Sequence, residues 1–221
     1  MGEKRLIDLS HDVEHGMITY KGLPAPLICD FLSREAAKQK YNEETTFQIG
    51  KIEMVANTGT YVDAPFHRYK DGKDLSELPL ESLAELEGLV FHAKPEQRAI
   101  GPELFGNTEV GGKAVLVHTG WARHWGMDQY FEGHPYLTEA AGQWLKEQGA
   151  ALVGIDSLNI DGTDTGYRPV HTTLLGADIP ICEHLCKLEA LPNRDFRFHA
   201  VPVKVRRFGT FPVRAYAVLD R

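Results

Sequence analysis

The sequence has few cysteines, no long apolar run and no cluster of positive charge, and each absence excludes a class of protein. Only three cysteines occur among 221 residues, and this odd, small number argues against a disulfide framework and favours a reducing compartment. No stretch approaches the roughly 18 apolar residues of a membrane span, and the N-terminal residues lack the apolar centre of a signal peptide. We therefore expect a cytoplasmic protein with no membrane partner.

The charge balance points away from nucleic acid. The chain has 31 acidic and 24 basic residues and a formal net charge of -7. Its basic residues form no run of the length that follows a phosphate backbone, so we expect no nucleic-acid partner. The length and a hydrophobic content of 43% allow one large core. Residues 1–221 are therefore expected to form a single domain.

The apolar patterns indicate a mixed α/β fold. A helix is expected at residues 137–149, with Thr138 as its N-cap and Gly149 at its end. The leucines of residues 74–88 suggest two helical turns interrupted by proline, with Gly88 as C-cap. Strands are expected at residues 5–11, 45–55, 89–92, 114–120 and 151–156, and again in the last forty residues.

Two segments imitate known motifs without completing them. Cys182 and Cys186 stand four residues apart in a stretch that we interpret as helical, which is not the CxxC spacing of a redox pair, so they are interpreted as structural thiols. Residues 161–166 begin like a calcium loop, but the twelfth position is Thr172 instead of glutamate. We interpret this segment as a turn-rich loop that leads to His171.

Residues 57–67, Asn-Thr-Gly-Thr-Tyr-Val-Asp-Ala-Pro-Phe-His, concentrate glycine, proline, a carboxylate and a histidine between two patterned segments. Asp63 offers two oxygens to a hard cation, and His67 offers either a ligand nitrogen or a base whose ordinary pKa is about 6.5. Pro65 stiffens the loop between them. The spacing alone is also compatible with a turn-capping aspartate and a half-exposed histidine of no catalytic role.

This segment resembles the HxGTHxDxPxH signature of the cyclase-type metal-dependent hydrolases, the family that includes bacterial kynurenine formamidase and isatin hydrolase. The resemblance continues along the chain, in the segments 8–11, 115–121, 134–156, 171–185 and 202–219. It implies a swivelling β/β/α-type single domain with a mixed sheet. It also implies a homo-oligomer, either a homodimer or a homotetramer.

In such enzymes the aspartate of the signature, a late histidine and a late glutamate bind divalent metal, and the last histidine of the signature acts as base. By position, the resemblance makes Asp63, His171 and Glu183 metal ligands and His67 the base. Asn57 and Tyr61 stand where the family has two further histidine ligands. Asn57 still offers a carbonyl oxygen to the metal, whereas the neutral phenol of Tyr61 is a poor ligand.

This departure changes the expected cofactor and the role of Tyr61. We expect one divalent ion instead of two, either Mn²⁺ or Zn²⁺, with Mg²⁺ as the alternative. Tyr61 is expected to act catalytically, by donating a hydrogen bond to the oxyanion that develops on the substrate.

The resemblance implies a metal-dependent hydrolase of a small amide, either an arylformamide such as the N-formylkynurenine of tryptophan catabolism or a cyclic amide. The alternative is a metal-poor relative that binds a small molecule without turning it over, because Asn57 and Tyr61 lack imidazoles. A lyase or dehydratase using the same groups is a third interpretation. Further residues that could approach the site are His11, His118 and His134, with Trp121 and Tyr20 as an aromatic wall.

Overall fold

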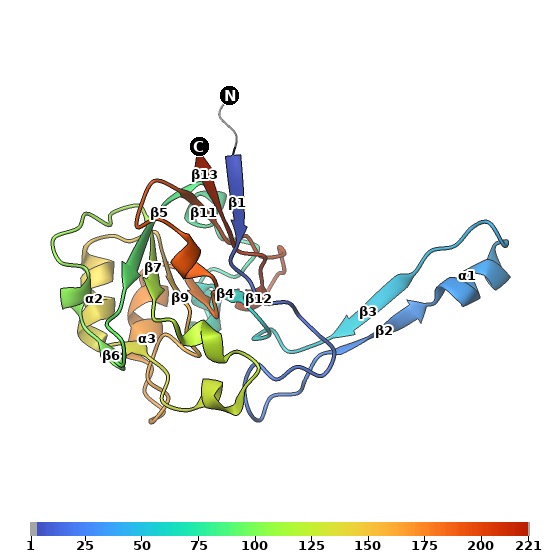
Figure 1. Cartoon of the computed structure of the whole chain (residues 1–221), viewed down its shortest axis with the longest axis horizontal. Coiled ribbons are helices and arrows are strands. Elements are labelled where there is room, and N and C mark those ends of the chain that lie inside the picture. The colour runs from blue at the N-terminus through green and yellow to red at the C-terminus, as the bar shows by residue number, and fades with distance from the viewer. Residues whose placement is uncertain (1–3, 221) are drawn as a thin grey trace.

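The computed structural model describes residues 4–220, in which nine strands form one curled mixed sheet with the order β1-β13-β11-β5-β7-β9-β10-β4-β12 (Figure 1). The strands are β1 Lys4–Asp8, β4 Tyr61–Asp63, β5 Leu86–His92, β7 Ala114–His118, β9 Leu152–Ile155, β10 Ile181–Glu183, β11 Arg197–His199, β12 Thr210–Pro212 and β13 Tyr216–Asp220. β5, β7, β9 and β10 run parallel, and the strands on both sides of them pair antiparallel. The predicted mixed α/β architecture is confirmed.

The remaining elements surround this sheet. The α-helices of the described residues are α1 Arg34–Lys40, α2 Glu139–Glu147 and α3 Pro169–Leu175. Two small sheets consist of β2 Leu27–Leu32 with β3 Ile49–Glu53, and of β6 Ala99–Ile100 with β8 Tyr136–Leu137. The 3-10 turns are η1 Pro65–His67, η2 Leu80–Ser82, η3 Pro102–Leu104, η4 Trp121–His124, η5 Asp128–Phe131 and η6 Leu188–Ala190. Among residues 4–220 no helix has the length and apolar character to cross a membrane.

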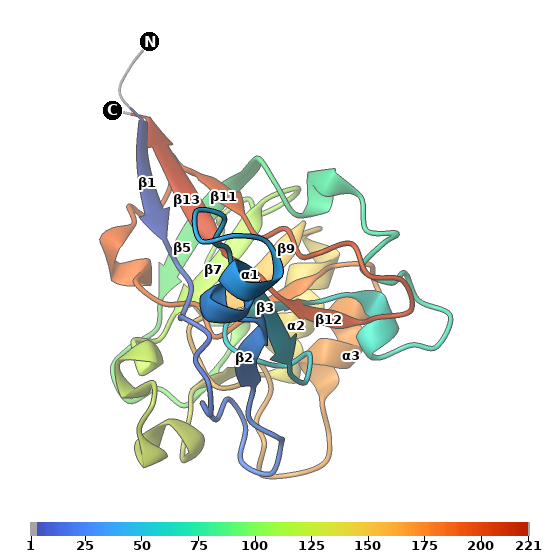
Figure 2. The ribbon, with the colours of Figure 1, turned by 90° about the vertical axis from the view of Figure 1, so that its right-hand side faces the viewer.

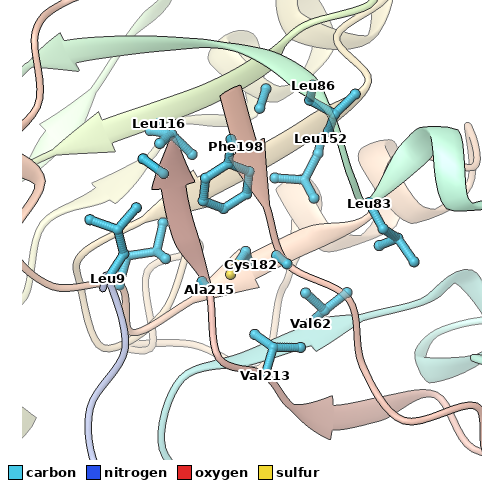
Figure 3. Packing of buried hydrophobic residues seen from close by; sticks show 14 of the residues in the cluster. Leu9, Val62, Leu83, Leu86, Leu116, Leu152, Cys182, Phe198, Val213 and Ala215 are labelled. Carbon is cyan, nitrogen blue, oxygen red and sulfur yellow. The ribbon is translucent and has the colours of Figure 1, made fainter. Parts of the chain in front are cut away.

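The central strands are buried on both faces, as their unbroken apolar sequences predict. Successive side chains of a strand point to opposite faces, and in β7 this sends Leu116 to one hydrophobic cluster and Val117 to the other. The Val117 cluster includes Leu145 of α2 and Leu174 of α3, so these two helices cover that face. The Leu116 cluster lies within the curl of the sheet, where Phe198 packs among side chains from strands on both sides (Figure 3).

Helix α2 confirms the predicted helix, with shorter bounds than the pattern gave. The Thr138 hydroxyl accepts a hydrogen bond from the backbone N–H of Ala141 at 3.2 Å, which makes Thr138 the N-cap. Gly149 follows the helix with a φ of +70°, a left-handed conformation that glycine adopts without a steric penalty. The chain then turns directly into β9.

Two local predictions are wrong. The only helical element that the structure shows within residues 74–88 is the 3-10 turn η2. Gly88 lies inside β5 instead of ending a helix. Four leucines of this irregular segment, Leu75, Leu78, Leu83 and Leu86, are buried in one cluster, whereas Leu80 is exposed, so the spacing reflects a segment that covers the core. Cys182 lies in β10, with Cys186 after it, because the short apolar run there is a strand buried in the sheet.

β2 and β3 form an antiparallel ribbon apart from the main sheet. With α1 between them they make up residues 27–53, an arm that projects from the body of the molecule in Figure 1 and points towards the viewer in Figure 2. The predicted strand at 45–55 corresponds to β3, so this prediction is confirmed in type. The strand carries the chain back to the body, where residues 57–67 begin.

Gly88 gives a test of the core. A Cβ atom at this position would lie 2.0 Å from a ring carbon of Phe196, a buried residue. We expect Gly88→Ala to lower the free energy of unfolding by about 1–3 kcal/mol through overpacking, measured by urea denaturation. Gly166→Ala is the matched control, since a Cβ there meets nothing within 4 Å. An unchanged midpoint for Gly88→Ala would contradict this packing.

Candidate functional site

The pairing of β4 with β10 brings distant parts of the sequence to one place. In this antiparallel pair Tyr61 lies opposite Glu183 and Asp63 lies opposite Ile181. Tyr61, Asp63 and Glu183 therefore point to the same face, away from the cluster inside the curl. His67 follows in η1, which packs against α3, the helix that carries His171. The residues predicted from the signature and from the late motifs are thus neighbours.

Three of these side chains form a potential cation site. Asp63, His67 and His171 each offer one ligand atom, and these atoms lie within 4.8 Å of one another. His171 Nε2 lies 3.6 Å from Asp63 Oδ2 and 3.7 Å from Glu183 Oε1. Asp63 Oδ2 is buried and has no hydrogen-bond partner among the described residues.

An unpaired buried carboxylate oxygen is costly unless a cation neutralises it. Carboxylate oxygens together with an imidazole nitrogen are donors that Mn²⁺ and Zn²⁺ accept. The residues present therefore fit a divalent metal ion. Asp63 Oδ2 is the atom that most requires it.

Asp161 orients His171. Its carboxylate accepts hydrogen bonds from the backbone N–H groups of Val170 at 2.8 Å and His171 at 3.0 Å, and lies 2.7 Å from His171 Nδ1. The protonated Nδ1 donates to Asp161, which leaves Nε2 facing Asp63 and Glu183. The sequence places Asp161 in a turn-rich loop and misses this role. The sequence does contain a signal for this role. An acidic residue shortly before the start of a helix can accept hydrogen bonds from the backbone N–H groups of the first turn.

The electrostatics of the site are set by buried charges of opposite sign. Burial lowers the pKa of His171, but its hydrogen bond to Asp161 and the nearby carboxylates of Asp63 and Glu183 outweigh burial and raise this pKa to about 10. Burial raises the pKa of Glu183 to about 7, although the charge of His171 acts in the opposite direction. Without a metal ion, a protonated His171 is thus the counter-ion of the carboxylates. A bound metal ion would replace that proton.

Thr210 of β12 joins His67 to Asp63. Its hydroxyl donates a hydrogen bond to Asp63 Oδ1 and lies 2.9 Å from His67 Nδ1. Because the single hydroxyl proton goes to Asp63, the hydroxyl oxygen accepts from a protonated Nδ1 of His67. The Nε2 atom of His67 then keeps its lone pair. The sequence offers no signal for Thr210, which is an ordinary threonine in a strand.

Gly209 allows β12 to approach His67. A Cβ atom at Gly209 would lie 2.4 Å from the backbone nitrogen of His67. The Gly209 carbonyl accepts a hydrogen bond from the backbone N–H of Ala64 at 2.7 Å. Backbone therefore packs on backbone here, which only glycine permits.

Two phenols occupy the other side of Glu183. The Tyr61 hydroxyl donates to Glu183 Oε2 at 2.6 Å, and the backbone N–H of Ile160 donates to Oε1 at 2.6 Å. The Tyr20 hydroxyl lies 2.9 Å from that of Tyr61 and donates to the carbonyl of Leu158 at 2.6 Å. Tyr20, expected as part of an aromatic wall, therefore belongs to a buried hydrogen-bond network.

Both phenols are neutral. Burial, followed by the charge of Glu183, raises the pKa of Tyr61 and of Tyr20 well above the ordinary value. A hydrogen bond from Asn57 acts in the opposite direction on Tyr61 and is a smaller effect, which places the Asn57 side chain next to this phenol. Asn57 thus lies beside Tyr61 at the edge of the site.

Three other candidates lie outside the group formed by Asp63, His67 and His171. His118 Nδ1 lies 2.8 Å from His92 Nδ1. His134 is buried and contacts the carbonyl oxygen of Asp161 at 3.0 Å, so it supports the loop behind His171. The Trp121 indole N–H donates to a backbone carbonyl, that of Tyr130, at 3.0 Å.

His11 also lies outside this group. Its ring stacks on Trp125 with a centroid separation of 3.9 Å and an interplanar angle of 4°. Its backbone N–H donates to the Thr60 hydroxyl at 3.0 Å. Burial lowers the pKa of His11 to about 4, and the charge of Lys187 adds to this effect. The ring is therefore neutral at neutral pH.

Comparison of the sequence with known proteins gives consistent matches. A family model described as "Putative cyclase" matches residues 7–162. Kynurenine formamidase from Geobacillus thermodenitrificans is 29% identical over 175 residues, which cover 78% of this chain and 81% of that protein. Kynurenine formamidase from Bacillus cereus is 27% identical over 215 residues, or 95% of each protein.

Solved structures share the fold. Isatin hydrolase A from Labrenzia aggregata, bound to benzyl benzoate, superposes with a TM-score of 0.84 at 20% identity, covering 99% of this chain and 94% of that chain. A protein described as "predicted metal-dependent hydrolase" from Bacillus stearothermophilus gives a TM-score of 0.77 at 23% identity and covers 98% of both chains. At these identities the likeness concerns the fold.

The pKa of His11 predicts a pH dependence of stability. The pKa of His11 is about 4 in the folded state and about 6.5 in the unfolded state. Below pH 6.5 the unfolded chain therefore binds a proton that the folded chain does not, and the free energy of unfolding decreases as pH falls towards 4. The loss is expected to amount to about 2–3 kcal/mol after allowance for solvent screening. Urea denaturation of the wild type and of His11→Phe across this range should show a shallower decline in the variant. Parallel declines in the two proteins would contradict the expected titration.

Proposed function

The chain belongs to the "Putative cyclase" family, and from this premise we propose that it hydrolyses a small amide with the help of one divalent metal ion. The observation that carries the proposal is the buried pair of Asp63 and His171 beside the exposed His67. The relatives named kynurenine formamidase and the structural neighbour named isatin hydrolase support two substrate classes. These are an arylformamide, such as N-formylkynurenine, and a cyclic amide.

We assign the metal to Asp63 and His171, with Glu183 as the third ligand and Asn57 as a further oxygen donor. When bound, the ion supplies Lewis acidity, which polarises a carbonyl group and lowers the pKa of water. Mn²⁺ or Zn²⁺ suits this donor set, with Mg²⁺ as the alternative. Asp161 supports the assignment because it holds the Nε2 atom of His171 towards the two carboxylates.

His67 also offers a ligand atom within 4.8 Å of those of Asp63 and His171. Two features favour a role as base instead. Its side chain is exposed, so it can meet substrate and water. Thr210 accepts from its Nδ1, so Nε2 is free to take a proton from the attacking water and pass it to the leaving amine. Thr210 is then a positioning residue for this base.

Tyr61 supports a single ion. Its neutral hydroxyl donates to Glu183 Oε2, so this oxygen already has a partner, and the phenol itself would be a poor ligand for a second cation. Tyr20 reinforces this arrangement through its contact with the Tyr61 hydroxyl. The oxyanion role expected for Tyr61 stays a prediction, because its proton is directed at Glu183 in this structure.

Metal stoichiometry tests the cofactor assignment. After loading with Mn²⁺ or Zn²⁺ and removal of excess metal, mass spectrometry of the digested protein should find about one ion per chain. Asp63→Ala and His171→Ala should lose it, whereas Tyr61→His should bind more than one, because it returns an imidazole beside Glu183. Two ions in the wild type would contradict the single-ion proposal. Absence of bound metal would favour the metal-poor binding relative.

Hydrolysis tests the proposed activity. The protein, loaded in turn with Mn²⁺, Zn²⁺ and Mg²⁺, should hydrolyse N-formylkynurenine or a cyclic amide such as isatin, followed by absorbance. His67→Gln should lower kcat by about 100-fold or more through loss of the base, while its metal content stays unchanged.

His15→Gln is the matched control, since His15 is an exposed histidine that is not assigned to the site. It should keep wild-type kcat. The proposal is wrong if no tested amide is turned over faster by the wild type than by His67→Gln with any of the three metals.

A further inference from the structure

Arg68 directly follows the residue assigned as base. His67 ends η1, and Arg68 is the C-cap residue of this turn. The Nε atom of Arg68 donates a hydrogen bond to the Thr172 hydroxyl at 3.2 Å. Thr172 follows His171 in α3. The guanidinium group is therefore held between the turn that carries the proposed base and the helix that carries a proposed metal ligand.

Two neighbouring side chains fix the same segment against α3. The Tyr69 hydroxyl donates to the carbonyl of Thr172 at 2.7 Å, and the backbone N–H of Tyr69 donates to the Pro65 carbonyl at 2.9 Å. Lys73 Nζ lies 2.6 Å from a carboxylate oxygen of Asp178, which comes shortly after α3. The backbone from which Arg68 extends is thus fixed relative to the helix of His171.

The chain does not compensate the positive charge of Arg68. The residue is exposed, and among residues 4–220 it forms no ion pair. Nε is the one atom of its guanidinium group that donates a hydrogen bond within this range. Both Nη groups are therefore available to a ligand. Two such groups bind the two oxygens of a carboxylate through parallel hydrogen bonds.

Arg168, which precedes α3, has a different role. Its Nη1 atom donates to the backbone carbonyls of Gly162, Thr165 and Tyr167. These bonds hold the loop before α3 in place, so the guanidinium group of Arg168 serves the structure of that loop. Arg68 makes no comparable set of bonds, and the stability of the fold therefore does not account for its guanidinium group.

The surroundings of Arg68 are basic. Residues 68–73 and 204–207 together contain Asp71 as their acidic residue and six basic residues, which are Arg68, Lys70, Lys73, Lys204, Arg206 and Arg207. The two segments are neighbours, because the backbone N–H of Arg207 donates to the buried Asp74 at 2.6 Å. The second segment leads to Gly209, which packs on the backbone of His67. In a chain of net charge -7, this side of the site attracts anions.

We propose that Arg68 binds a carboxylate group of the substrate, so that the preferred substrate is an amide that also carries a carboxylate. This inference rests on the proposed function, since the scissile amide must lie at His67 for the same molecule to reach Arg68. The carboxylate belongs either to the aromatic ring, as in N-formylanthranilate, or to an amino-acid side chain, as in N-formylkynurenine. Arg68 selects and positions the substrate and takes no part in breaking the bond.

Ligand binding tests the anion site without turnover. The affinities of the metal-loaded protein for anthranilate, for kynurenine and for the uncharged aniline are measured by isothermal titration calorimetry. At least one of the two carboxylates should bind more tightly than aniline, and Arg68→Gln should weaken that binding about 10-fold. Added salt should weaken it in the wild type more than in the variant. The metal content of Arg68→Gln should match the wild type, which shows an intact site.

Arg194→Gln is the matched control for binding, since Arg194 is an exposed arginine that is not assigned to the site. It should keep the wild-type affinity. The proposal is overturned if Arg68→Gln binds both carboxylates as tightly as the wild type does. It is equally overturned if the wild type binds neither carboxylate more tightly than aniline.

Turnover separates selection from a merely structural role. The ratio of kcat/KM for the better carboxylate substrate, N-formylanthranilate or N-formylkynurenine, to that for the neutral formanilide should fall about 10-fold in Arg68→Gln, mainly through KM. Arg68→Lys should recover part of this ratio, because it keeps the charge and loses the paired hydrogen bonds. An equal loss for charged and neutral amides would show a structural role and overturn the inference.

The two experiments also distinguish this inference from the proposed function. Hydrolysis with a substrate ratio that does not depend on Arg68 contradicts the present inference and leaves the hydrolase proposal in place. Carboxylate binding that depends on Arg68, without hydrolysis of any amide, contradicts the hydrolase proposal and leaves an anion site in a relative that binds without turnover.

Discussion

The antiparallel pairing of β4 with β10 is the constraint on which the site depends. It places Tyr61 opposite Glu183, and it gives Asp63 and Glu183 the same face of the sheet. Val62 precedes Asp63 in β4 and lies opposite Cys182 of β10, and both of these side chains point into the core inside the curl. A slip of one residue would exchange these sets. The carboxylates would then enter an apolar interior, so the packing of the core and the position of the charges enforce the same register.

The buried carboxylates at this site can only be retained with compensating groups. Glu183 has a donor on each oxygen, the phenol of Tyr61 and the amide of Ile160. Asp63 receives one hydroxyl on Oδ1, whereas Oδ2 has no hydrogen-bond partner in the described residues. Both oxygens of Glu183 thus have a donor, whereas Oδ2 of Asp63 has none. A cation is therefore needed mainly beside Asp63, where Nε2 of His171 faces it. This asymmetry is the physical reason why we propose one ion instead of two.

Local patterns predicted the elements whose form is determined locally. The buried strand β7 and the capped helix α2 belong to this group. The prediction of one loop that holds both Asp63 and His67 was wrong, because Asp63 lies in strand β4 and His67 in the 3-10 turn η1. His171 and Glu183 came only from the resemblance to a family, because nothing near them in the chain indicates chemistry.

Thr210 was missed because its partner is chosen by tertiary structure, since it meets a residue 147 positions away. Asp161 was missed because its role depends on where helix α3 begins, and its partners, Val170 and His171, follow it by nine and ten residues. The prediction of helical turns at 74–88 was wrong for a related reason. In an irregular segment that covers the core, the buried leucines can by chance have the spacing of a helix. The single-domain organisation, the cytoplasmic location and the assignment of site roles stay predictions.

Gly209 shows that the geometry of the candidate site depends on the absence of a side chain. The position of His67 relative to Thr210 is set by backbone contact at a residue with no functional group. A survey of reactive side chains would pass over this position, and a search for substrate contacts would do the same. For protein engineering, the positions near the site that resist substitution therefore include those where two backbone segments pack closely, and not only those with reactive side chains.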